Sequence, residues 1–222
     1  MKNELIAEFL GSLFLVMAAI GSRVMLYYTM DGGAALALVG NAISVAWVLY
    51  ALIEVFGPIS GAHFNPVVTF VMYLEKKLAM KKMFLFFAFQ ILGGVLGTAV
   101  THQMFAERFD DLLFISDNFR GGPRYFSEAV ATFALVFTIL TLAKRGSARI
   151  PMVVSLLVGG LILATSSTMF ANPQVTIARI FTDSVSGIGP NHAIMFVLMQ
   201  FAGALVAFAL YKIMSKEDSQ ND

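Results

Sequence analysis

The sequence predicts an all-α membrane protein with six membrane-spanning helices, two half-spanning helices and an inverted internal repeat. Three observations support this fold class. The 222 residues are 58% apolar and only 13% charged, whereas about a quarter of the residues of a soluble domain are charged. Six apolar stretches have about the length that a helix needs to cross a bilayer. Two Asn-Pro segments occupy corresponding places in the two halves of the chain.

The six apolar stretches predict the spanning helices and their orientation. We expect the spans at residues 5–26, 34–56, 80–102, 125–143, 150–169 and 191–212. If the spans alternate in direction, ten of the fifteen Lys and Arg residues fall on the side of the two chain ends. Basic residues concentrate on the cytoplasmic side, so both termini are expected in the cytoplasm and the chain in the plasma or inner cell membrane.

The two halves repeat three short segments in the same order. The matched segments begin at Glu8 and Glu128, at Phe64 and Ala171, and at Gln90 and Gln200. Each half contains three spans, an odd number, so the second half is inverted in the membrane. We therefore expect one transmembrane domain over 1–222, with a first repeat at 1–102, an extracellular connection at 103–124, an inverted repeat at 125–212 and a disordered cytoplasmic tail at 213–222.

Asn-Pro is a helix-start signal, because Asn is a good N-cap and Pro a good first helical residue. Short helices are predicted at 67–74 and 174–182, each about 12 Å long and thus half a bilayer. Inverted symmetry brings their N-termini together near the midplane, where irregular backbone must be buried or line a cavity. The candidate pore-midplane residues are Asn65, Pro66, Val67, Asn172, Pro173 and Gln174.

The two segments resemble the paired signatures of the aquaporin, or major intrinsic protein, family. Ser60-Gly61-Ala62-His63-Phe64-Asn65-Pro66-Val67-Val68-Thr69 is similar to the first signature, and Ala171-Asn172-Pro173-Gln174-Val175-Thr176 to the second. The resemblance extends from Glu8 to Tyr211. It implies one pore in each subunit, assembly as a homotetramer in a lipid bilayer, and a role for Glu8 and Glu128 in bracing the re-entrant loops. An occluded proton relay is the alternative role of these two acids.

A passive channel for small uncharged solutes is the predicted function. Asn65 and Asn172 can cap their half-helices and still offer N–H donors to the lumen. The helix N-termini carry roughly +0.5 charge each, so a cation about 5 Å from both meets about 3 kcal/mol at an effective dielectric of about 20. Water, glycerol, urea and neutral arsenous acid are expected to pass, and ions are not. The alternative is a secondary transporter, since inverted repeats also build transporters.

The predicted constriction departs from the family pattern. The family usually has Arg three residues after the second Asn, where this chain has Val175. Counting along the matched segments places Val45, Gly160 and Met169 beside it, which predicts a wide and apolar constriction. The segment also resembles a bacterial subgroup that lacks this Arg and is associated with metalloid (arsenite) handling.

Three charged or titratable residues are candidates for the vestibules. Arg179 lies one helical turn beyond Val175 and either reaches the outer vestibule or pairs with Asp183, which we prefer. His63 is a candidate for the inner vestibule. Glu54 either faces the same vestibule or is a solvated residue near the end of its helix.

Enzymatic, metal-dependent and nucleic-acid-binding functions are not expected. The chain has no Cys, three His and a net charge of +1. It shows no metal-ligand cluster, no nucleophile arrangement and no basic surface for phosphates. No cofactor, no metal and no nucleic-acid partner is therefore predicted.

Overall fold

The computed structural model describes residues 1–218, which form helices and loops without a strand. Five of the described helices are long and apolar enough to cross a membrane: α1 Lys2–Val24 with the π-helical turn η1 Met25–Thr29, α2 Gly33–Ser60, α4 Met80–Met104, α5 Pro123–Lys144 and α8 Pro190–Asp218. A shorter apolar helix, α6 Ile150–Ala164, has 15 residues. The all-helical membrane fold predicted from the sequence is confirmed.

Two short helices begin at the Asn-Pro segments. α3 Pro66–Leu74 has Asn65 as its N-cap, and α7 Pro173–Ala178 has Asn172. A 3-10 turn, η2 Arg179–Phe181, continues α7. Both helices are too short to span a bilayer, which needs roughly 20 residues.

Two boundaries differ most from the prediction. The fifth span was expected to reach residue 169, but α6 ends at Ala164, where Thr165 becomes extended. The following residues form a re-entrant loop with left-handed backbone at Thr168, Met169 and Ala171, which a helix cannot contain. Residues 213–218, expected to be disordered, continue α8, since this stretch contains no Gly or Pro to end the helix. Residues 219–222 of the expected tail lie outside the described residues.

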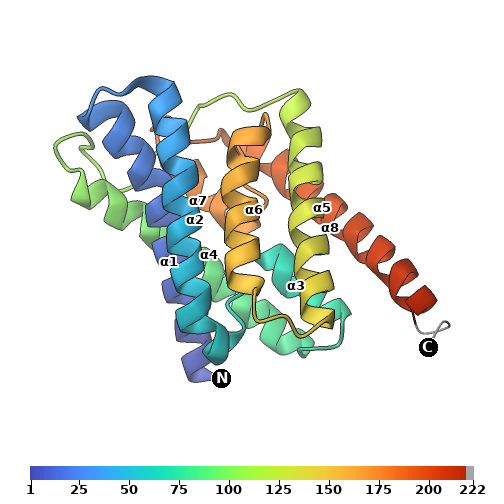
Figure 1. The fold of residues 1–222 in the computed structure, drawn as a ribbon. Helices are drawn as coiled ribbons and strands as arrows, with labels where there is room; N and C mark the ends of the chain where they lie inside the picture. Colours follow the sequence, from blue (N-terminus) through green and yellow to red (C-terminus); the bar gives the residue numbers. More distant parts are fainter. Residues whose placement is uncertain (219–222) are drawn as a thin grey trace.

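The helices form one bundle around the two half-helices (Figure 1). α1 and α2 lie on one side, α5 and α8 on the other, and α6 between them, while α3 and α7 lie in the interior. The start of α1 and the end of α8 lie at the same end of the bundle, together with the turn after α3 and the α5–α6 loop (Figure 1). These two loops contain most of the Lys and Arg residues that were predicted to lie on the side of the chain ends. The structure has them at that end of the bundle (Figure 1).

Glycines allow close contact between corresponding helix pairs of the two repeats. A Cβ atom at Gly93 of α4 would lie 2.2 Å from the carbonyl oxygen of Phe9 in α1, and one at Gly203 of α8 would lie 2.1 Å from that of Ala129 in α5. Lipid tails provide no hydrophobic drive for helices to associate, so small residues at such contacts are a main source of packing energy. The two repeats therefore use the same device at equivalent positions.

We expect Gly93→Ala to destabilise the fold by about 1–3 kcal/mol, because the added methyl meets rigid backbone of α1. Gly160→Ala is the matched control, since nothing lies within 4 Å of a Cβ atom there, and it should stabilise α6 by about 0.5–1 kcal/mol. Thermal unfolding in detergent measures both. Equal melting temperatures for the two variants would contradict the packing argument.

Candidate functional site

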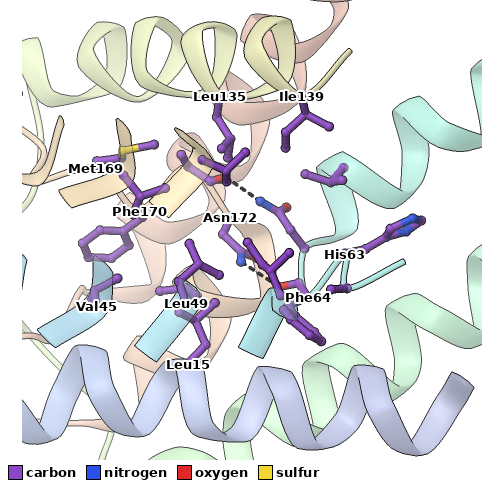
Figure 2. Close-up of a pocket in the computed structure, with 18 of the residues that line it drawn as sticks. Leu15, Val45, Leu49, His63, Phe64, Leu135, Ile139, Met169, Phe170 and Asn172 are labelled. Atoms are coloured by element: carbon purple, nitrogen blue, oxygen red, sulfur yellow. Dashed lines mark hydrogen bonds between the residues drawn. The ribbon is translucent and has the colours of Figure 1, made fainter. Parts of the chain in front are cut away.

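The N-termini of the two half-helices meet and are joined by their Asn side chains (Figure 2). The Oδ1 atom of Asn65 accepts from the N–H of Val67 at 3.0 Å, and that of Asn172 from the N–H of Gln174 at 3.1 Å. Each Nδ2 group donates to the opposite loop: Asn65 to the carbonyl of Ala171 at 2.9 Å, and Asn172 to that of Phe64 at 2.8 Å. An amide nitrogen carries two hydrogens, so each Asn retains one donor after these contacts.

Both loops that lead into the half-helices contain non-glycine residues with left-handed backbone. Ala62 and Phe64 have φ of 50° and 46°, and Met169 and Ala171 have φ of 41° and 45°. These pairs are related by the same 107-residue offset as Asn65 and Asn172. Such conformations cost of order 1–3 kcal/mol each and persist only where surrounding contacts hold them.

Glu8 of α1 holds the first loop. Its carboxylate accepts from the N–H groups of His63 at 3.0 Å and Phe64 at 2.7 Å, from the hydroxyl of Ser60 at 2.6 Å and from the amide of Gln90 at 2.7 Å. The side chain is fully buried. A buried carboxylate with this many donors is well satisfied, and it fixes two consecutive N–H groups of a strained loop.

Glu128 of α5 makes the equivalent contacts with the second loop. It accepts from the N–H groups of Phe170 at 2.9 Å and Ala171 at 2.8 Å, and from Gln200 at 2.7 Å. Gln200 also donates to Thr176 of α7 at 2.9 Å, as Gln90 does to Thr69 of α3. These are the contacts that a bracing role for both acids requires.

One continuous cavity of about 270 Å³ contacts both Asn residues. Near the chain ends it is bounded by Met72, Ala143 and Ile150, and at the opposite end by Met169 and Arg179. Its wall is otherwise mainly aliphatic, with lining residues that include Leu15, Val45, Leu49, Ile53, Val68, Leu135, Ile139, Val154, Val158, Ile162 and Val175. The cavity crosses the level at which the two half-helices meet, so it has the geometry of a pore.

Most of this aliphatic lining was not singled out from the sequence. Val154, Val158 and Ile162 follow the i, i+4 spacing of one helix face, as do Val45 and Leu49. Membrane helices are apolar on every side, so this spacing does not distinguish a pore-facing stripe from a lipid-facing one.

The predicted constriction is partly wrong. Val45, Met169 and Val175 line the cavity together, but Gly160 does not. Gly160 is exposed, and nothing lies within 4 Å of a Cβ atom built there. It is two residues, or about 200°, around α6 from the lining residue Val158. Ile162, two residues after Gly160 on α6, lines the cavity instead.

Four of the predicted midplane residues lie behind the cavity rather than in its wall. Pro66, Val67, Pro173 and Gln174 are buried but are not among the cavity-lining residues. Gln174 points to the protein interior, where its amide donates to the carbonyl of Phe64 at 3.2 Å. A Cβ atom at Gly94 would lie 2.2 Å from the Gln174 side-chain oxygen, so glycine at 94 provides its space.

The two candidates for the inner vestibule separate in the structure. His63 lines the cavity and its Nδ1 atom lies 3.0 Å from the hydroxyl of Thr69. Glu54 is exposed on α2 and does not line the cavity. The structure therefore does not place Glu54 beside His63 at the cavity.

Arg179 lines the end of the cavity that lies away from the start of α1, and it is only 3% exposed. Its Nη2 donates to the carbonyl of Ala19 at 3.3 Å, and its guanidinium lies 4.2 Å from the centre of the Phe170 ring. The preferred pairing with Asp183 is wrong: among the described residues no ion pair joins the two, and Asp183 is exposed. The turn from α7 into η2 directs Arg179 toward α1 instead.

Two further arginines at this end were missed as site residues. Arg23 of α1 donates to Asn41 at 3.2 Å and to the carbonyl of Val185 at 3.4 Å. Arg120, in the connection between α4 and α5, donates to the carbonyls of Gly187 at 2.7 Å and Val185 at 3.1 Å. Burial lowers the pKa of Arg120 to about 9, so the group is still charged at neutral pH. One indication of them was present in the sequence: they belong to the five Lys and Arg residues that do not lie on the side of the two chain ends.

The inverted repeat, the two half-helices that meet inside the bundle and the cavity beside them indicate a membrane channel. The family model described as major intrinsic protein matches residues 1–171. An aquaglyceroporin, AqpS, from Rhizobium meliloti (strain 1021) is 40% identical over 96% of this chain and 90% of its own length. Aquaporin TIP1-2 from Zea mays is 29% identical over 94% of this chain and 84% of its own length.

The fold matches a solved member of the same kind. The X-ray structure of the aquaglyceroporin from Plasmodium falciparum aligns with a TM-score of 0.73 over 94% of each chain, at 20% identity. The chain belongs to the major intrinsic protein family. It is therefore a passive membrane channel for small uncharged solutes and not an enzyme, and the secondary-transporter alternative is not supported.

Proposed function

We propose that the chain conducts water, glycerol- and urea-sized solutes and neutral arsenous acid through the cavity that contacts Asn65 and Asn172. The observation that carries this proposal is that one cavity contacts both Asn side chains and extends from Ala143 and Ile150 to Arg179. The relative named an aquaglyceroporin supports the choice of glycerol as a substrate.

The chemistry of the wall favours solutes with hydroxyl groups on a small apolar body. Each Asn has one amide hydrogen left after its contact with the opposite loop, so two donors are offered at the level of the half-helix N-termini. The aliphatic side chains around them accommodate the carbon or metalloid centre. Val45, Met169, Ile162 and Val175 are the proposed constriction, which contains no polar side chain to compete for hydroxyl groups.

Cations are excluded by charge and by dehydration. The two half-helix N-termini repel a cation at the centre by about 3 kcal/mol at an effective dielectric of about 20. Arg179 adds a full positive charge at the outer end of the cavity. The aliphatic wall offers no carboxylate or carbonyl cage to replace the water of a cation, so charged solutes also pay a dehydration cost.

We further propose a homotetramer in the plasma or inner membrane with both termini in the cytoplasm. The basic residues at the end of the bundle that contains both termini support this orientation. Large apolar side chains on the outside of α2 and α6, including Trp47 and Leu156, are exposed and suit lipid or a neighbouring subunit.

Purified protein in liposomes tests the conduction proposal. We expect faster osmotic swelling with glycerol, urea and arsenous acid than in empty liposomes, and no dependence on a proton or sodium gradient. Asn172→Ala removes one cap and one cross-loop donor and should slow glycerol swelling; the cap alone is worth about 1 kcal/mol. Asn118→Ala, in the outer connection, is the control. Unchanged swelling in a well-folded Asn172→Ala protein, or uphill accumulation driven by pH, would contradict the proposal.

A further inference from the structure

Three buried guanidinium groups gather at the outer end of the cavity. Arg23 and Arg120 donate to the same carbonyl oxygen, that of Val185, at 3.4 Å and 3.1 Å. Arg120 and Arg179 contact the same Phe170 ring, with guanidinium carbons 4.9 Å and 4.2 Å from its centre. The three side chains are 7%, 9% and 3% exposed. We call these three residues the arginine cluster.

Within residues 1–218, no carboxylate forms an ion pair with the arginine cluster. The acids of the outer connections, such as Asp117 and Asp183, are exposed. Glu128 is the buried acid of this half, and both its oxygens already accept hydrogen bonds from the second loop and Gln200. The cluster is therefore held by carbonyl oxygens and an aromatic ring, and Glu128 acts on Arg120 and Arg179 only through its charge, without a direct ion pair. One buried carboxylate does not balance three guanidinium groups.

Arg179 also has donors without an acceptor. Its Nε and Nη1 atoms, and the Nη2 atom of Arg23, are buried and find no hydrogen-bond partner among the described residues. Buried donors in proteins are normally paired, and an unpaired charged donor is costly. Arg179 lines the cavity together with Val175 and Met169, so an acceptor within the cavity lies next to this side chain.

We propose that the arginine cluster is a binding subsite for a small monovalent oxyanion at the outer end of the pore. The oxyanion accepts hydrogen bonds from Arg179, while Arg23 and Arg120 stabilise it through their charge. A single negative charge fits the site best, since the aliphatic wall next to it penalises the dehydration of a divalent anion more strongly. A bound anion lies beside the proposed constriction and slows neutral solutes that enter from outside.

Nitrate is a suitable probe, because it is a small oxyanion that does not cross lipid as a neutral acid at neutral pH. We expect external nitrate to lower glycerol flux at least about twofold in a saturable manner, while gluconate at equal ionic strength does not, because gluconate is a much bulkier anion than nitrate. Arg179→Gln should abolish the nitrate effect, and Arg179→Lys, which keeps the charge, should retain part of it. Arg108→Gln is the matched control, since Arg108 is an exposed outer arginine that stacks on Tyr28.

A binding measurement separates this inference from the conduction proposal, on which the flux experiment rests. At about ten times its Kd, nitrate should raise the melting temperature of the purified protein by about 4 °C relative to gluconate. The shift should persist in Arg108→Gln and disappear in Arg179→Gln. If Arg179→Gln does not fold, Arg23→Gln serves instead and should lower the affinity several-fold.

The outcomes are distinct. A lack of glycerol flux in the unaltered protein contradicts the conduction proposal, and the melting experiment then decides the anion site alone. Equal responses to nitrate and gluconate, or an equal nitrate shift with and without Arg179, would overturn the anion site.

Discussion

Glu128→Ala is expected to prevent formation of a stable channel. The substitution removes the acceptor of two consecutive N–H groups, those of Phe170 and Ala171, and of the amide of Gln200. All three donors are in the protein interior, where hydrogen bonds to a charged partner contribute about 1.5–3 kcal/mol each. The same loop holds Met169 and Ala171 in left-handed conformations that it cannot keep without support.

The expected loss is about 3–5 kcal/mol, a large part of the stability of about 5–15 kcal/mol that proteins have. Glu128→Gln should lose less, since its side-chain oxygen still accepts from one N–H group. Glu4→Ala is the control: Glu4 pairs with Lys82 at 2.6 Å near the membrane edge, and such pairs contribute about 0–1 kcal/mol. Thermal unfolding in detergent and glycerol swelling give the readouts. Wild-type stability and swelling for Glu128→Ala would show that the second loop holds its shape without this carboxylate.

Val175→Arg should reduce glycerol flux by about tenfold or more, which corresponds to about 1.4 kcal/mol or more in the barrier. Val175 is 6% exposed and lines the cavity beside Val45 and Met169, so a longer side chain fills the narrow part of the path. The new charge lies one helical turn from Arg179. At about 6 Å and an effective dielectric of about 20, two such charges repel by about 3 kcal/mol. Water is small enough to pass a partly filled constriction, so its flux should fall less.

Val175→Ile is the matched control, because it adds one methyl group without charge and should leave both fluxes close to those of the unaltered protein. Arg179→Ala, measured alongside these two variants, tests whether that arginine provides the barrier to cations at the outer end. Stopped-flow light scattering gives water and glycerol permeability for each protein. Equal loss of both permeabilities in Val175→Arg, or an unchanged glycerol permeability, would show that the constriction lies elsewhere.

Several features of the fold followed from local signals in the sequence. Both half-helices begin at Asn-Pro, because the Asn side chain satisfies an N–H group of the first turn and Pro lacks the N–H group that would be left over. Glu8 and Glu128 were identifiable as a pair in need of partners because acids within membrane spans require them and these two occupy matching repeat positions. That their partners are the re-entrant loops was implied by the family resemblance. The positions of the spans followed from length and hydropathy, apart from the end of α6.

The rotation of helices and the direction of side chains were decided by the tertiary structure. Gly160 faces outward while Val158 and Ile162 face the cavity, and an apolar helix does not show this in its sequence because all its sides are apolar. The inward direction of Gln174 depends on the space at Gly94, which is 80 residues away in the chain.

The arginine cluster shows the same division between sequence and structure. From the sequence, Arg23, Arg120 and Arg179 are three separate basic residues on the side opposite the basic face. The structure unites them through the carbonyl of Val185 and the ring of Phe170. Arg120 and Val185 lie 97 or more positions from Arg23 in the chain. Contacts over such a separation depend on how whole helices pack and not on a local pattern. Local chemistry thus determined where the helices begin, and packing determined which side chains face the pore.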